Sequence, residues 1–401
     1  MRGWLLGLLL MVATAPACES NHDALAKPSN GTGGSAGASR GGSGGSQAGF
    51  TTVPQTGGTK TSSGGRAPDE PPGDNVLTFL HGIVDAERVL VCFLSGTGVD
   101  ARVLDAEPAA LDYGQSLVRT EFEGADLAKD DVEPVVIAGE LELVSGLDCA
   151  DALELARKEQ DAAPTTVDDP TASAGAGGGG ASSTGTGAGG EGGVGAPLPE
   201  PPRLRVGELP IVPAGTIDGG RSYLLVGSGC IGGPAFAGKY AQTACGDQYS
   251  PATPTLSGVL VALSRRTQIG SLGLQVAHAS AATGTVNVYA SRVMSDETNS
   301  WIASSLEYGA LVPGVVQPTL SAEAYGVDSP FWQIELLSDF TQLLAERWSA
   351  IKMRAGLSTL VDGRSYTLVV LGPAAGFTRK GFWNPPALSV VPNDPTRPAD
   401  D

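Results

Sequence analysis

Residues 361–372 read V-D-G-R-S-Y-T-L-V-V-L-G, and residues 217–229 read I-D-G-G-R-S-Y-L-L-V-G-S-G. In both stretches an Asp-Gly pair is followed by Arg-Ser-Tyr, directly or after a second glycine, and then by apolar residues. Asp-Gly favours a turn, because glycine accepts positive φ without steric cost. A short apolar run after a turn is typical of a β-strand. The same turn and strand are therefore expected at two places in the chain.

Three further pairs of segments recur in the same order along the chain. They are 76–93 with 273–290, 111–114 with 306–309, and 254–259 with 386–391. The first pair aligns His81 with His278, each at the end of an apolar stretch. Blocks that repeat in one order indicate tandem homologous domains. We expect one domain over 75–264, a second over 272–395, and a tail at 396–401.

The first copy is longer than the second because it contains a glycine-rich tract at 161–202. This tract lies between the His81 block and the Arg221-Ser222-Tyr223 block, so it falls inside the first copy. A segment of this composition buries too little apolar surface to offset the entropy of ordering it. We therefore predict a disordered insertion within the first domain.

Apolar residues alternate with other side chains in each copy. Val286 and Val288 do so in one segment, and Tyr366, Leu368 and Val370 do so in another. A period of two, interrupted often by glycine and proline, indicates short antiparallel strands. The predicted fold is mainly β, with two tandem antiparallel β-sandwiches of the immunoglobulin or fibronectin type.

Two segments have helical spacing. One runs over 337–351, with Ser338 as its expected N-cap, and the other over 149–158, with Asp148 as its expected N-cap. We place both at the same position in their respective copies. Each sandwich is thus expected to carry one helix in a long connection.

The segment from Leu357 to Tyr366 resembles the corner before strand F of immunoglobulin-like and fibronectin-like sandwiches. In that corner a tyrosine enters the strand, and its hydroxyl bonds back to the preceding turn. We expect Tyr366 and Tyr223 to be buried corner residues of this kind. The alternative is a ligand site that occurs twice.

Residues 274–289, L-Q-V-A-H-A-S-A-A-T-G-T-V-N-V-Y, are followed by Tyr308-Gly309. This pattern resembles a bacterial extracytoplasmic family known only as a domain of unknown function, whose modules open with V-V-H-A-S-P-D-A-P-x-V-D-V-Y. The resemblance covers 272–395 well and 75–264 more loosely, and Ala281-Ala282 replaces the Pro-Asp of the pattern. It implies exported β-sandwich modules that are often tandem and attached to a surface. It implies no catalytic residues.

The N-terminus has the pattern of an export signal at residues 1–18. A positive Arg2 and a short apolar run precede Ala15-Pro16-Ala17-Cys18, and small residues at these positions suit a signal peptidase. A cysteine directly after Ala17 resembles a bacterial lipobox, so we expect Cys18 to be lipidated and to anchor the chain. The alternative is a secreted protein cleaved nearby. Residues 19–74, rich in Gly, Ser and Thr, are expected to be a disordered tether.

The formal net charge of the chain is −18. Nucleic acids need Lys and Arg to neutralise their phosphates, so this charge argues against a nucleic-acid partner. It argues equally against binding to anionic lipid head groups. We expect the protein to contact a membrane through its lipid anchor only. We also expect it to be exported and held at the periplasmic or cell-surface side of a bacterial membrane.

The sequence offers little catalytic chemistry. His81 and His278 occupy equivalent positions in the two copies, so we interpret them as structural residues that bond to backbone. Zinc-protease, nucleophile-elbow, phosphate-loop and EF-hand motifs do not occur. We predict no metal site and no cofactor, and we expect the protein not to be an enzyme.

Four cysteines follow Cys18, and all lie in the first copy. In an oxidising compartment they allow three pairings. We prefer the pairings Cys92–Cys149 and Cys230–Cys245. The first is favoured because a helix starting near Cys149 would cover the strand face that carries Cys92. A zinc site is the alternative.

The loop from Phe377 to Pro386 is rich in aromatic and basic residues. Sandwiches often bind through such loops, and Arg379, Lys380, Phe382 and Trp383 are the candidates for holding a glycan or a carboxylate. Alternatively, the two aromatic residues plug the end of the sandwich.

Three functions remain open at this point. The first is a non-enzymatic envelope lipoprotein that presents two sandwiches for binding, adhesion or scaffolding. The second is a carbohydrate- or cell-wall-binding module centred on Trp383. The third is an enzyme whose site forms only in three dimensions. The partner is an unknown protein or glycan.

Overall fold

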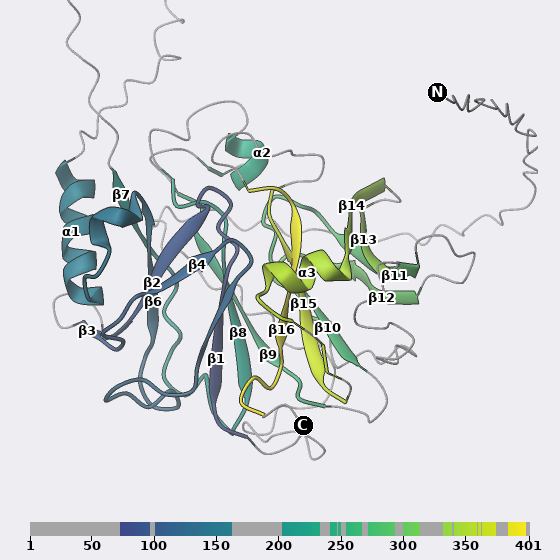
Figure 1. Ribbon diagram of the computed structural model, residues 1–401, viewed down its shortest axis with the longest axis horizontal. Coiled ribbons are helices and arrows are strands. Elements are labelled where there is room, and N and C mark those ends of the chain that lie inside the picture. The colour runs from purple at the N-terminus through teal and green to yellow at the C-terminus, as the bar shows by residue number, and fades with distance from the viewer. Residues whose placement is uncertain are drawn as a thin grey trace, which may run out of the picture. The chain divides into compact units, whose positions relative to one another are not determined.

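The computed structural model describes the residues that Figure 1 draws in colour. These are 73–96, 101–162, 203–232, 241–246, 248–249, 254–266, 272–292, 300–312, 332–338, 341–358, 360–361, 363–373 and 384–397. All of them belong to one compact unit, Gln47–Asp401. Most of their regular structure is β-strand, arranged in several sheets with few helices. The predicted mainly β fold is confirmed.

The first half of the described chain forms two sheets around one core. Its strands are β1 (Val76–His81), β2 (Arg88–Ser95), β3 (Arg102–Val103), β4 (Ala109–Asp112), β5 (Ser116–Arg119), β6 (Glu133–Gly139), β7 (Leu204–Glu208), β8 (Ser222–Ser228) and β9 (Ser257–Leu263). One sheet has the order β5-β1-β8-β9, and the other has the order β3-β2-β6-β7, with β4 also paired to β2. Side chains from both sheets, such as Phe79 and Phe93, meet in the core between them.

The second half has the same arrangement of strand pairings. Its strands are β10 (Gly273–His278), β11 (Val286–Arg292), β12 (Ser300–Leu306), β13 (Trp332–Ser338), β14 (Thr341–Arg347), β15 (Ser365–Leu371) and β16 (Ala387–Pro392). Their sheets are β10-β15-β16 and β12-β11-β13-β14. In each half the first strand pairs in parallel with the strand after the corner, β1 with β8 and β10 with β15, while the other pairs are antiparallel. A bridge between Ala277 and Leu311 holds the place of β5.

The two sandwiches share a third core. In β15, Tyr366, Leu368 and Val370 face the core of the second sandwich, whereas Val369 and Leu371 face the opposite way. These two side chains join a cluster with residues of the first sandwich, namely Leu80, Leu224, Val226, Val259, Val261 and Leu263. The sheets β5-β1-β8-β9 and β10-β15-β16 therefore pack face to face. Both faces of β8 and of β15 are covered by other strands, and for this reason every residue of these two strands is buried.

The helix α1 (Cys149–Ala162) covers the outer face of the first sandwich, beside β7 in Figure 1. Asp148 caps it as expected, because its carboxylate accepts the N–H of Asp151 at 2.9 Å. The helix includes residues 161–162, which the sequence had assigned to the glycine-rich insertion; residues 163–202 lie outside the described residues. A short helix α2 (Ala241–Cys245) and a 3-10 helix η2 (Leu141–Val144) are additional elements.

The helix expected over 337–351 is wrong in its first part. Residues 341–347 form β14, which pairs with β13 in a hairpin, and Ser338 pairs with Thr341 at its end instead of capping a helix. The helix α3 starts only at Trp348 and ends at Arg354. Pairing along β13 outweighs the helical spacing of the apolar residues. Because α3 follows β14 while α1 lies between β6 and β7, the two helices do not occupy equivalent places.

Candidate functional site

The repeated Arg-Ser-Tyr stretch forms a tyrosine corner. The backbone N–H of Val361 donates to the hydroxyl oxygen of Tyr366 at 2.7 Å. The ring of Tyr366 is 3% exposed and lies in the core of the second sandwich. Tyr223 is likewise buried, in the core of the first sandwich, and its pKa is raised by burial despite a hydrogen bond with the backbone of Asp218. The structural interpretation of both tyrosines is confirmed.

The two histidines also serve the fold. The Nε2 atom of His81 lies 3.0 Å from the carbonyl oxygen of Ala86, and its Nδ1 atom accepts the N–H of Ile83 at 3.3 Å. His278 makes the corresponding contacts with Gly284 and Ser280, at 2.9 and 3.3 Å. A carbonyl can only accept, so in each ring Nε2 carries the proton and Nδ1 is the acceptor. Both nitrogens of each neutral ring are therefore engaged by backbone.

Burial of His81 should make the protein sensitive to acid. Desolvation lowers the pKa of His81 from 6.5 to about 3. Between these two pH values, the unfolded chain binds a proton at His81 and the folded chain does not. The free energy of unfolding therefore falls as the pH drops from 6.5 towards 3. At pH 5 the expected loss is about 2 kcal/mol, from about 1.5 pH units at about 1.36 kcal/mol each.

Urea unfolding at pH 7 and pH 5 measures this effect, with His81→Asn as the comparison. The variant is expected to be less stable at both pH values but to lose about 2 kcal/mol less than the wild type between them. Other titrating groups are common to both proteins and cancel. Equal losses in the two proteins would contradict the assignment.

Each histidine contacts a tyrosine that reaches into the other sandwich. The His81 ring packs edge-on against Tyr113, and the His278 ring packs edge-on against Tyr308. The hydroxyl of Tyr308 lies 2.9 Å from Oγ of Ser228 and 2.8 Å from that of Ser257, both in the first sandwich. The hydroxyl of Tyr113 donates in the opposite direction, to the carbonyl of Pro385 at 3.3 Å. These pairs close one end of the shared core.

Arg265 closes the other end. It is 1% exposed and lies between the two sandwiches in sequence. Its guanidinium donates to Oγ of Ser222 at 2.9 Å and to the carbonyls of Gly220 and Asp74 at 2.8 and 2.6 Å. Asp394 of the second sandwich lies 3.8 Å away. Asp74, which the sequence had placed in the tether, is therefore held against the folded unit.

The four candidates in the aromatic loop, Arg379, Lys380, Phe382 and Trp383, lie outside the described residues. The next residue, Asn384, is 3% exposed and bonded to the first sandwich. Its N–H donates to the carbonyl of Val84 at 2.8 Å, and its side-chain amide donates to those of Ile83 and Ala86 at 3.2 and 2.7 Å. The end of this loop therefore serves the contact between the sandwiches.

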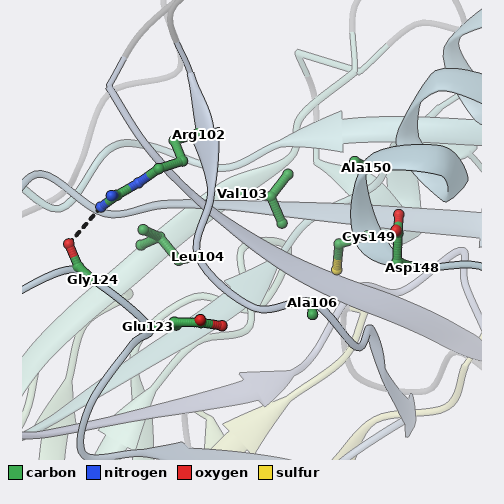
Figure 2. Close-up of a pocket in the computed structure, with 9 residues that line it drawn as sticks. All are labelled: Arg102, Val103, Leu104, Ala106, Glu123, Gly124, Asp148, Cys149 and Ala150. Atoms are coloured by element: carbon green, nitrogen blue, oxygen red, sulfur yellow. Dashed lines mark hydrogen bonds between the residues drawn. The ribbon is translucent and has the colours of Figure 1, made fainter.

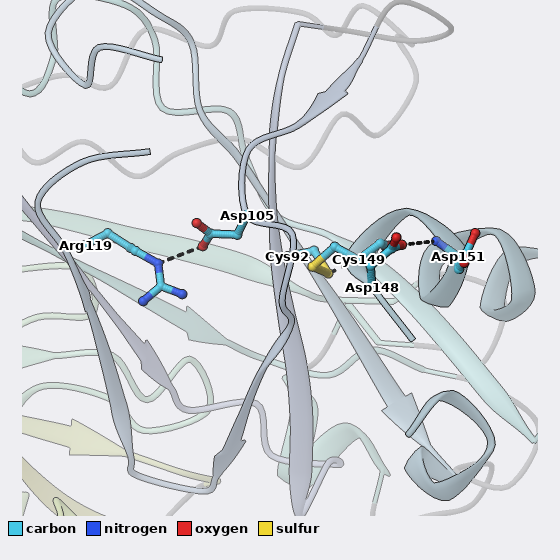
Figure 3. Close-up of a disulfide and its surroundings, with 6 residues drawn as sticks. All are labelled: Cys92, Asp105, Arg119, Asp148, Cys149 and Asp151. Atoms are coloured by element: carbon cyan, nitrogen blue, oxygen red, sulfur yellow. Dashed lines mark hydrogen bonds and ion pairs between the residues drawn. A yellow bond between two sulfur atoms is a disulfide. The ribbon is translucent and has the colours of Figure 1, made fainter. Parts of the chain in front are cut away.

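The two disulfides of the structure are the pairings preferred from the sequence. Cys92–Cys149 joins β2 to the start of α1, as Figure 3 shows. Cys230–Cys245 joins the segment after β8 to α2. Among the residues that the structure describes, no group of three or more His, Cys, Asp or Glu side chains is placed to hold a metal ion. The four cysteines are thus engaged in disulfides.

A hollow of about 430 Å³ lies beside the Cys92–Cys149 disulfide (Figure 2). A second hollow of about 650 Å³ adjoins it and shares Ala106 and Asp148. Arg102 points away from Asp148 and donates to the carbonyl of Gly124 at 2.6 Å. Since Asp148 caps α1, Arg102 and Asp148, two of the three charged residues that line the first hollow, already have structural partners. They do not converge as an acid and a base would have to.

Asp85 is a buried carboxylate that sequence reasoning missed. Its two oxygens accept the N–H groups of Ile231 and Gly232, each at 2.9 Å. Burial raises the pKa of Asp85 to about 6, although these bonds and the charge of Arg205 favour the ionised form. The carboxylate holds the backbone of residues 231–232, directly after Cys230 of the Cys230–Cys245 disulfide. Only the fold could show it, because its partners are distant in sequence.

An aromatic pair on the second sandwich was also missed. Trp301 of β12 lies opposite Tyr289 of β11, with ring centroids 3.9 Å apart. The Trp301 side chain is 54% exposed and borders a shallow hollow of about 350 Å³. The alternation of β11, with Val286 and Val288 inward, was the available signal that Tyr289 points outward.

A scan against models of known protein families finds no match to this chain. A search of curated proteins also finds no similar sequence. Within the described ranges, no helix has the length and apolar character needed to span a membrane. The proposed function therefore rests on the N-terminal sequence and on the geometry of the described residues.

Proposed function

We propose that the protein is a non-enzymatic lipoprotein of the bacterial cell envelope that presents a double β-sandwich as one binding body. The observation that carries this proposal is the core shared by the two sandwiches. Hydrogen bonds from Tyr308, Tyr113 and Arg265 flank that core at its two ends. The outer sheets and loops of both sandwiches then belong to one solid support, as binding surfaces require.

A structural role for the buried titratable side chains supports a non-enzymatic protein. Both nitrogens of His81 and of His278 are bonded to backbone. The carboxylate of Asp85 is bonded to two backbone amides. A catalytic base must reach a substrate proton, whereas these groups face the interior of the fold.

The N-terminal sequence supports attachment to a membrane. Cys18 follows an apolar run and small residues, and a long Gly- and Ser-rich segment separates it from β1. A chain of this composition acts as a flexible linker. It would hold the double sandwich away from the lipid surface. Cys18 itself lies outside the described residues.

The anchor is tested by comparing the wild type with Cys18→Ser in the native host or in a bacterium that lipidates exported proteins. We expect the wild type in the membrane fraction, with a diacylglyceryl cysteine as its first residue by mass spectrometry. The Cys18→Ser variant should be found in the aqueous fraction and not with membranes or detergent. Its melting temperature should equal that of the wild type. A wild-type chain that starts elsewhere with an unmodified residue would contradict the anchor.

A further inference from the structure

The outer faces of the two sandwiches differ at corresponding positions. In the first sandwich, Cys92 of β2 lies opposite Val135 of β6. The residues of this face are apolar and are covered by α1. In the second sandwich, Tyr289 of β11 lies opposite Glu335 of β13. Here β13 ends at Ser338 and β14 starts at Thr341, so the connection is too short to contain a helix like α1.

This outer face of the second sandwich combines an aromatic surface with a polar network. Trp301 and Tyr289 form the aromatic part. Beside them, the carboxylate of Glu335 accepts from the amides of Gln333 and Gln342, each at 3.0 Å, and from the hydroxyl of Ser291. Each glutamine amide has a carbonyl oxygen and a second N–H besides the one directed at Glu335. The network therefore orients amide groups on the far side of Tyr289 from the exposed indole, because the sheet order is β12-β11-β13-β14.

We propose that this aromatic platform, formed by Tyr289, Trp301, Gln333, Glu335 and Gln342, binds a neutral saccharide chain. The C–H face of a pyranose ring is apolar and fits the exposed face of an indole ring. The sugar hydroxyls would bond to the glutamine amides, which both donate and accept. This assignment deepens the proposed function and rests on it, since it gives the binding body a ligand class.

Charge argues against an anionic ligand. Glu335 places a carboxylate beside the aromatic pair, and the whole chain has a formal net charge of −18. Both repel uronic acids, sulfated glycans and other polyanions. A neutral sugar avoids this repulsion and still provides hydroxyl groups for hydrogen bonding.

A protein partner fits this platform less well. A specific protein interface buries about 800 Å² on each side, whereas Trp301 and Met353 are the only large apolar side chains exposed in the described part of the chain, and Met353 lies in α3. A peptide strand added along β12, the edge strand that carries Trp301, is disfavoured too. The β11–β12 pairing has two register shifts, and Ser305 has a φ of 50°, so the edge strand β12 is irregular.

The test is isothermal titration of the mature full-length protein with neutral hexasaccharides of glucose, mannose and N-acetylglucosamine. At least one is expected to bind with a Kd of about 10 µM to 1 mM. Trp301→Ala and Tyr289→Ala should each weaken that binding at least tenfold, and Trp301→Phe should weaken it less. Met353→Ala removes the other exposed apolar side chain and should leave binding unchanged.

Melting temperatures show whether each variant is folded. If Trp301→Ala does not fold, Gln333→Ala with Gln342→Ala removes the amides and should also weaken binding at least tenfold. The proposal is overturned if none of the three sugars binds, or if the platform variants bind as the wild type does. It is also overturned if polyuronates or peptides, titrated in parallel, bind while the sugars do not. If no sugar binds but Cys18 proves to be lipidated, the saccharide site alone is overturned and the proposed lipid anchor stands.

Discussion

Truncation of Tyr366 to alanine is expected to lower the free energy of unfolding by about 3–5 kcal/mol, the usual range for a buried aromatic side chain. The ring is 3% exposed and packs in the core with Leu368. Its removal leaves a cavity at the point where the chain crosses from one sheet to the other. Tyr366→Phe keeps the ring and removes one hydrogen bond with Val361, so it should cost about 1 kcal/mol.

Chemical denaturation of the three proteins measures both effects. Tyr223→Phe is the matched variant in the first sandwich, because Tyr223 is buried at the corresponding corner. A tyrosine that contacts a ligand would behave differently, since stability would be retained while binding failed. Unfolding curves that Tyr366→Ala leaves unchanged would therefore refute the corner.

Replacing Val369 by aspartate is expected to destabilise the protein by about 4 kcal/mol or more. Val369 is fully buried in the core that the two sandwiches share. A carboxyl group at this position must be neutral or lie ionised in an apolar interior. Holding it protonated at pH 7 costs about 4 kcal/mol, from the difference between pH 7 and an ordinary pKa of about 3.9. An ionised group costs more.

The control for this prediction is Met353→Asp, which introduces the same charge in the second sandwich. Met353 is 77% exposed on α3, so its replacement should change stability by no more than about 0.5 kcal/mol. Thermal and urea unfolding compare the two variants. Equal, small effects from both would show that the Val369 site is open to water and that the sandwiches do not share a core.

Local patterns were sufficient to predict the features that lie within one sandwich. The Asp-Gly turn and the alternation after it located Tyr366 and Tyr223, because a corner and its strand are close in sequence. The position of Cys92 on the outward side of its strand led to the pairing with Cys149, which the structure has. The equivalence of His81 and His278 indicated a role in the fold, and both bond to backbone.

The shared core was not predicted, because alternation within a strand shows which faces are apolar but not what covers them. A signal was present in the unbroken run Leu224, Leu225 and Val226, which is typical of a strand buried on both faces. The helix expected from Ser338 failed because apolar spacing alone did not distinguish a helix from a hairpin. Likewise, only the strand register brings Tyr289 and Trp301 together.

Hydrogen exchange followed by mass spectrometry on the full-length Val369→Asp variant tests the shared core most directly. If the two sandwiches form one body, the substitution in the second sandwich should lower the opening free energy of β8 and β9 in the first by the same amount as that of β10, β15 and β16. Exchange should then become faster in all five strands. The Met353→Asp control should leave all of these strands protected. Faster exchange confined to residues 272–397, with β8 and β9 as protected as in the wild type, would contradict a common core.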